Sequence, residues 1–212
     1  MKIFDIDGPL YKFMLTLTNI VTLNFCWILG TLIGLGTTIG VSTVAAFDVG
    51  LRMVRNEEGY IAKQFVRAWK SNFKQGFPLG LVNLVAAYAV YLDLAIFHAK
   101  ENASVFLLIW GILSGIIVLV SFLYAYPQTA RYKNSLFKII RNSFRISTRF
   151  PIRTLLLIIC LTIETLSFMW NYTTMLFGIL IGPAALILTV STFAMPIFDK
   201  IESNNKRIKE EE

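Results

Sequence analysis

The chain has 212 residues, of which 56% are hydrophobic and 16% are charged. Soluble domains are about 45–50% apolar and about 25% charged, so this composition excludes an ordinary soluble globular protein. A net charge of +7 would suit a nucleic-acid-binding protein, but here apolar runs of membrane-spanning length separate the basic residues. We therefore predict a membrane protein with no nucleic-acid partner.

Five apolar runs are long enough to cross a membrane. About 20 apolar residues, each rising about 1.5 Å in a helix, cross a bilayer core of about 30 Å. The predicted spans are about residues 13–36, 77–97, 105–126, 152–170 and 174–195. They predict an all-α integral membrane protein with a single transmembrane domain, residues 1–198, followed by a charged cytoplasmic tail, residues 199–212.

The basic residues predict how the spans are oriented. Of the 20 Lys and Arg residues, 17 fall in residues 51–76, 128–153 and 199–212. Short cytoplasmic loops of membrane proteins are enriched in Lys and Arg, so we place all three segments in the cytoplasm. Because the number of spans is odd, the N-terminus is then outside and the C-terminus is cytoplasmic.

The end of the first span is rich in small residues. Residues 30–46 read GTLIGLGTTIGVSTVAA, with Gly30, Gly34, Gly36 and Gly40 among Ser and Thr. Such a stretch allows helices to pack closely, and it also allows a broken or re-entrant backbone. The sequence leaves both possibilities open.

The first two basic segments each predict an amphipathic helix, because their apolar residues recur at helical spacing. In the first segment one face is apolar: Ile61, Phe65, Ala68, Trp69 and Phe73. The opposite face is basic: Lys63, Arg67, Lys70 and Lys74. In the second segment the apolar stripe is Leu136, Ile140 and Phe144, and the basic stripe is Lys138, Arg141, Arg145 and Arg149.

These two helices have two possible roles. At the inner membrane surface their basic faces would contact anionic lipids, each Lys or Arg contributing about 1 kcal/mol. Alternatively, one or both helices would dock on a cytoplasmic or membrane partner, with Trp69 or Phe73 as apolar anchors. Both roles are compatible with one another.

Four polar side chains lie inside the predicted spans, where they are costly and often functional: Asn24, Asn83, Asp93 and Glu164. The two asparagines suit hydrogen bonds between helices. The two carboxyl groups suit either interfacial hydration and interhelical hydrogen bonds or an outward-facing polar cavity that contacts a ligand such as a sugar.

Residues for catalysis are scarce in this chain. Nucleophilic, acid–base or metal catalysis needs convergent His, Cys, Asp or Glu side chains. The chain has a single histidine, His98, and two cysteines inside spans, Cys26 and Cys160. No nucleotide-binding loop, zinc motif or nucleophile elbow is present. We therefore predict no enzymatic activity, no cofactor and no metal.

Several stretches resemble a bacterial family. They are DGPL at 7–10, LNFCW at 23–27, the Gly/Thr-rich stretch ending in VSTVAA, and the basic segment at 51–76. Together they resemble the YesL-like family of bacterial integral membrane proteins. The matching positions are Asn24, Trp27, Gly40, Phe65, Phe73 and Lys74. Members usually carry a proline in or beside the Gly/Thr-rich stretch, and here Leu35, Ser42 and Thr43 occupy the corresponding positions.

The resemblance implies a cellular setting. The family is largely a domain of unknown function whose genes accompany those of carbohydrate ABC transporters. It therefore implies a non-catalytic accessory subunit in the bacterial cytoplasmic membrane, with transporter permease subunits as partners. The alternatives are an independent solute carrier or substrate-capture protein, and a membrane-surface scaffold or signalling partner. The sequence indicates no particular sugar and no oligomeric state.

Overall fold

The computed structural model describes residues 8–99 and 105–210, and all regular elements within them are helical. Asp7 of the DGPL stretch and most of the predicted external link 98–104 lie outside the described residues. The helices are α1 (Pro9–Leu32), α2 (Ile39–Val54), α3 (Ile61–Ser71), α4 (Phe73–Ala99), α5 (Val105–Val120), the π-helical segment η1 (Ser121–Ala125), α6 (Tyr126–Arg131), α7 (Leu136–Arg149), α8 (Pro151–Met169) and α9 (Tyr172–Glu210).

Five helices of the described residues are long and apolar enough to cross a membrane, as predicted. Their apolar stretches are Leu10–Leu32, Phe73–Phe97, Leu108–Arg131, Pro151–Met169 and Tyr172–Asn204. In each of them only 17–28% of the most apolar 18-residue stretch is buried inside the protein. The remaining apolar surface requires a lipid environment, so the fold indicates a multi-pass membrane protein.

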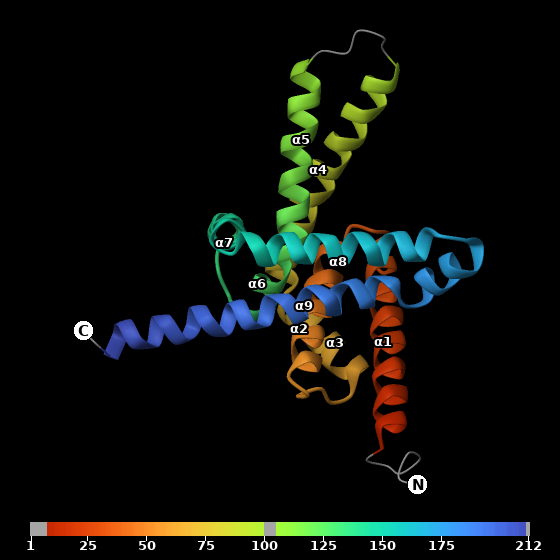
Figure 1. The fold of residues 1–212 in the computed structure, drawn as a ribbon, viewed down its shortest axis with the longest axis vertical. Helices are drawn as coiled ribbons and strands as arrows, with labels where there is room; N and C mark the ends of the chain where they lie inside the picture. Colours follow the sequence, from red (N-terminus) through yellow and green to blue (C-terminus); the bar gives the residue numbers. More distant parts are fainter. Residues whose placement is uncertain (1–7, 100–104, 211–212) are drawn as a thin grey trace.

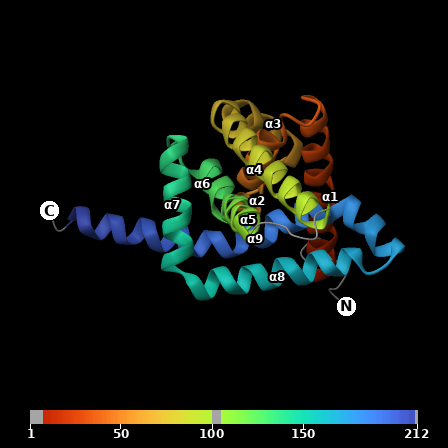
Figure 2. The same ribbon diagram turned by 90° about the horizontal axis from the view of Figure 1, so that it is seen from above.

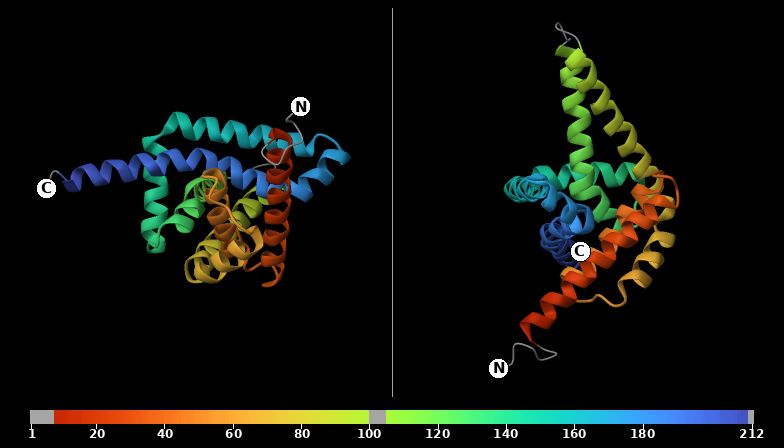
Figure 3. Two further views of the ribbon diagram at one scale, coloured as in Figure 1. Left: turned by 90° about the horizontal axis from the view of Figure 1, so that it is seen from below. Right: turned by 90° about the vertical axis from the view of Figure 1, so that its right-hand side faces the viewer.

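The helices form two hairpins around a short central helix. The hairpin of α4 and α5 extends upward in Figure 1, whereas α8 and α9 run across the view beneath it. Figure 2, from above, shows α8 and α9 side by side, with α7 crossing the direction of α8. Figure 3 shows α4 and α5 projecting away from the remaining helices. The two hairpins therefore meet at the core without sharing an axis.

The central helix is α2, which the sequence did not separate from the first span. It contacts α1, α3, α4, α6 and α9, and twelve of its sixteen residues are buried. Small residues allow these close approaches. A methyl group added to Gly40 would lie 2.3 Å from the Cα atom of Gly80 and 2.5 Å from the carbonyl oxygen of Gly76, so α2 and α4 touch backbone to backbone.

The predicted span 13–36 is too long at its end, because α1 stops at Leu32. The chain then turns over residues 33–38, where Leu35 and Gly36 have φ of 48° and 89°. Glycine adopts this left-handed conformation freely, while leucine adopts it at a cost. Both possibilities for the Gly/Thr-rich stretch are therefore realised, a break at 33–38 and close packing from Gly40 onward.

The two basic segments contain helices, α3 and α7, with differences in detail. Phe73 is the first residue of α4 and not part of α3. In α7 the buried residues are Ile139, Ser143 and Ile146, whereas the predicted stripe of Leu136, Ile140 and Phe144 is only half-buried. The shift arises because the Ser143 hydroxyl accepts a hydrogen bond from Gln128 (3.0 Å) and donates one to Ile139 (2.8 Å). These bonds satisfy a polar group in the core.

The charged tail is continuous with the last helix. Residues 199–212 were predicted to be a charged tail, either a solvated extension or a frayed helix, and α9 continues to Glu210. Ile201 packs against the core, and Asp199 and Glu202 form ion pairs with residues of other helices. The first turns of this segment are therefore part of the folded structure.

Candidate functional site at the junction of the charged segments

The three charged segments meet at one place, which we call the charged junction: Arg55, Arg131, Tyr132, Asp199 and Glu202. Arg55 donates to Asp199 at 2.6 Å. Arg131 binds Glu202 through two nitrogens, Nε and Nη2, each 2.9 Å from a carboxylate oxygen, and its Nη2 lies 3.1 Å from Asp199. Segments whose side chains touch must lie on the same side of any membrane that the chain crosses.

The Arg131–Glu202 pair is the best-packed part of the junction. The Arg131 side chain is only 16% exposed, and its guanidinium lies 5.8 Å from the ring centre of Phe198. Two-point contact with a carboxylate is the strong form of an arginine ion pair. Tyr132 donates a hydrogen bond from its hydroxyl to the same carboxylate. Burial and then this bond raise the pKa of Tyr132, so the phenol remains a donor at neutral pH.

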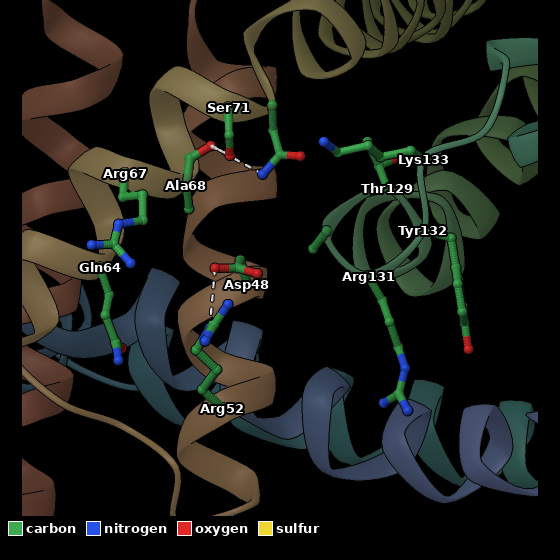
Figure 4. A pocket seen from close by; sticks show the side chains of 12 residues that line it. Asp48, Arg52, Gln64, Arg67, Ala68, Ser71, Thr129, Arg131, Tyr132 and Lys133 are labelled. Carbon is green, nitrogen blue, oxygen red and sulfur yellow. Dashed lines mark hydrogen bonds and ion pairs between the residues drawn. The ribbon is translucent and has the colours of Figure 1, made fainter.

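A pocket of about 240 Å³ lies beside the junction, between α2, α3 and the end of α6. Figure 4 shows Arg67 and the Asp48–Arg52 pair on one side and Lys133 on the other. The Arg52 Nε atom lies 3.3 Å from Asp48. Arg131 and Tyr132 line the pocket but point toward α9. The two predicted basic segments, which are far apart in the sequence, thus contribute to one pocket.

The predicted partner-contact residues are largely free of internal contacts. All eight basic side chains are exposed: Lys63, Arg67, Lys70, Lys74, Lys138, Arg141, Arg145 and Arg149. Trp69 is half-buried, and its indole N–H donates to Ser42 at 3.2 Å. Phe73 is 37% exposed and its ring lies 5.2 Å from that of Trp69. Of the two predicted aromatic anchors, Phe73 is the more accessible.

A groove lies between the start of α4 and the segment that leads into α7. Gln75, near the start of α4, donates from its side chain to the carbonyl of Asn134 at 3.1 Å. This bond ties the chain after α3 to the chain before α7. Between them lies a groove of about 420 Å³ whose walls include Lys74, Lys133 and Leu136.

Asn24 connects α1 to α9 where proline interrupts α9. Pro183 has no N–H, so the Ile179 carbonyl lacks its helical donor. The Asn24 amide donates to Ile179 (3.0 Å) and to Leu180 (2.8 Å). Its oxygen accepts from the Ala184 N–H at 3.3 Å. One buried side chain thus satisfies the Ile179 carbonyl that Pro183 leaves unpaired, and it also bonds the Leu180 carbonyl and the Ala184 N–H.

The other intramembrane polar residues have separate surroundings. Asn83 in α4 donates to the Tyr126 hydroxyl at 3.3 Å. Asp93, also in α4, faces Gly111 of α5, and one of its carboxylate oxygens is buried without a hydrogen-bond partner among the described residues. Glu164 in α8 accepts from Thr189 of α9 at 2.9 Å.

These polar residues do not gather around one cavity. Asp93 lies on the α4–α5 hairpin and Glu164 on the α8–α9 hairpin. Five pockets among the described residues have walls that contain neither of them, nor Asn83. None of these five therefore provides the polar cavity that the solute-carrier alternative predicts.

Sequence reasoning missed the charged junction. Asp199 and Glu202 stand three residues apart, and such residues share one face of a helix. That spacing was the available signal, but it was hidden in a segment of mixed charge. Within residues 8–99 and 105–210, no group of three or more His, Cys, Asp or Glu side chains is placed to hold a metal ion.

The fold and the junction thus indicate a helical, multi-pass membrane protein whose three charged segments meet at one place. Residues 20–94 match the model of a family described as a protein of unknown function, DUF624. The match covers about a third of the chain, from within α1 to within α4. No curated protein and no solved structure matches the chain.

Proposed function

We propose that the protein is a non-catalytic accessory subunit of a bacterial carbohydrate ABC transporter. In this proposal it lies in the cytoplasmic membrane with the N-terminus outside, and α3, α7 and the C-terminus are cytoplasmic. The transporter assignment rests on the resemblance to the YesL-like family alone. The family model that matches residues 20–94 is one of unknown function and names no partner.

The contact surface consists of the exposed faces of α3 and α7. The observation that carries this part of the proposal is the difference between two sets of cations. Arg55 and Arg131 are paired with carboxylates inside the fold, whereas the eight basic residues of α3, α7 and the start of α4 have exposed side chains. Unpaired cations on one surface attract an acidic partner surface and anionic lipid headgroups.

The groove between the start of α4 and the start of α7 gives the partner a place to dock. Lys74 and Lys133 supply positive charge at its walls, and Leu136 supplies an apolar contact. Such a groove suits a helix with acidic and apolar residues. We propose that a cytoplasmic helix of a permease subunit binds there and extends along the basic face of α7, while the basic face of α3 contacts anionic lipid.

The test is recovery of partners from native membranes. The tagged protein, purified in mild detergent, should bring down two permease subunits in stoichiometric amounts, as measured by mass spectrometry against an untagged strain. A Lys138→Glu/Arg141→Glu/Arg145→Glu variant should lose them. The matched control is Lys12→Glu, which reverses an exposed charge on α1 and should retain them.

Two results would contradict the proposal. If the wild-type protein came through alone from membranes with active sugar uptake, the accessory role would be wrong. If the triple variant and Lys12→Glu retained the permease equally, the association would not depend on α7. Recovery of anionic lipid without protein would favour the membrane-surface scaffold instead.

A further inference from the structure

We propose that the pocket between α2, α3 and the end of α6 binds a phosphate group, which is either free in solution or part of a lipid headgroup. This inference does not rest on the proposed transporter role, which assigns Arg67 to the basic face of α3 and Lys133 to the wall of the groove. It rests on the charge balance inside the pocket and on the elements that build it.

The pocket carries positive charge that the protein does not neutralise. Of its charged residues, Asp48 pairs with Arg52, and Arg131 is paired with Glu202 and Asp199. The remaining two, Arg67 and Lys133, have no ion pair or hydrogen-bond partner among the described residues. Two cations therefore line the pocket without a counter-charge.

The geometry favours a compact anion with several oxygens. Arg67 and Lys133 come from opposite walls (Figure 4), so an anion inside the pocket is attracted from both sides. Guanidinium and ammonium groups are the usual side-chain ligands of phosphate. The volume of about 240 Å³ admits a phosphate group, while an extended acidic helix would have to remain outside.

The walls also hold in place the backbone that carries the two cations. α3 is anchored to the core by Ile61, Phe65 and Ala68, which fixes Arg67 on the exposed side of the same helix. Lys133 follows Tyr132, whose ring packs against Phe198 at 5.7 Å. Both cations are therefore attached to well-packed backbone, which lowers the entropy lost when an anion binds.

The experiment uses the full-length protein and two sources of phosphate. One arm titrates inorganic phosphate into protein in a neutral detergent and measures the melting temperature, with sodium chloride at matched ionic strength as the control for screening. The second arm compares nanodiscs of phosphatidylglycerol with nanodiscs of phosphatidylcholine, and counts retained lipid by native mass spectrometry.

The variant Arg67→Gln/Lys133→Gln removes both cations. Both side chains are exposed, so the fold should be retained, and the melting temperature without ligand checks this. We expect the phosphate affinity to fall at least tenfold, because charge-assisted hydrogen bonds of this kind are strong. The control variant Lys12→Gln/Arg153→Gln removes two exposed cations that lie outside the pocket and outside the basic faces of α3 and α7, and it should bind normally.

Each outcome decides the inference. Stabilisation by inorganic phosphate that only the pocket variant loses would support a soluble phosphate ligand. Phosphatidylglycerol retention that only the pocket variant loses would support a lipid headgroup. Absence of binding in both arms would overturn the inference, as would equal loss in the pocket variant and the control variant, since that result reports total charge.

Discussion

Asn24 joins α1 to α9 at the point where Pro183 interrupts α9, and this contact makes a quantitative prediction. Replacing Asn24 with Leu keeps the approximate shape of the side chain but removes three hydrogen bonds to backbone groups. Interhelical hydrogen bonds in membrane proteins contribute about 0.6 kcal/mol on average and up to about 1.7 kcal/mol. We expect Asn24→Leu to lower the free energy of unfolding by about 2–3 kcal/mol, since the Ile179 carbonyl is left without a donor.

The same reasoning predicts that the loss depends on Pro183. In a Pro183→Ala background, residue 183 has an N–H that can donate to the Ile179 carbonyl within α9. Asn24→Leu should then lower the free energy of unfolding by less than about 1 kcal/mol, which gives a coupling energy between Asn24 and Pro183 of at least about 1 kcal/mol.

Unfolding in mixed micelles, followed by tryptophan fluorescence, measures these differences. Thr18→Ala is the matched control on α1, because the Thr18 hydroxyl is exposed and bonds only its own helix. That variant should change stability by less than about 0.5 kcal/mol. An equal cost of Asn24→Leu in the Pro183 and Ala backgrounds would refute the reasoning.

Three other contacts make separate predictions. Gly80→Ala would place a methyl group 2.6 Å from the Gly40 backbone and should lower the free energy of unfolding by about 2–3 kcal/mol. The control Gly115→Ala adds a methyl group that meets nothing within 4 Å and should not lower it. Equal melting temperatures of the two variants would contradict this prediction. Glu202→Gln should lower the free energy of unfolding by about 1–2 kcal/mol, and by less in an Arg131→Met background. An equal loss in both backgrounds would show that the Arg131–Glu202 ion pair is not responsible. Glu164→Ala removes one hydrogen bond, from Thr189, and sugar uptake at normal protein abundance should be unchanged; reduced uptake would favour a solute pathway.

Hydropathy was sufficient to predict the long helices and insufficient to predict the core. The five candidate spans are each apolar over a length that a bilayer requires, and this signal needs no knowledge of packing. α2 has only sixteen residues, many of them small, and its burial depends on five neighbouring helices. Its role as the centre of the fold is therefore a tertiary property, which periodicity within the segment does not contain.

Polar contacts between distant segments were the least predictable features. Asn24 was recognised as a candidate for an interhelical hydrogen bond, but its partner beside Pro183 lies about 160 residues away. The buried face of α7 contains Ser143, which apolar periodicity cannot select. Likewise, Asp199 and Glu202 resemble solvated charges until α9 is seen to pass Arg55 and Arg131. In each case the decisive interaction depends on how the helices meet.

Photocrosslinking in native membranes tests the central claim most directly. A photoreactive amino acid placed at Lys138, an exposed position on α7, should crosslink to a permease subunit, identified by mass spectrometry. The matched position is Leu155, which is 60% exposed on the apolar surface of α8 and should crosslink to lipid only. Crosslinking of position 138 to lipid alone, in cells that are taking up sugar, would contradict the account.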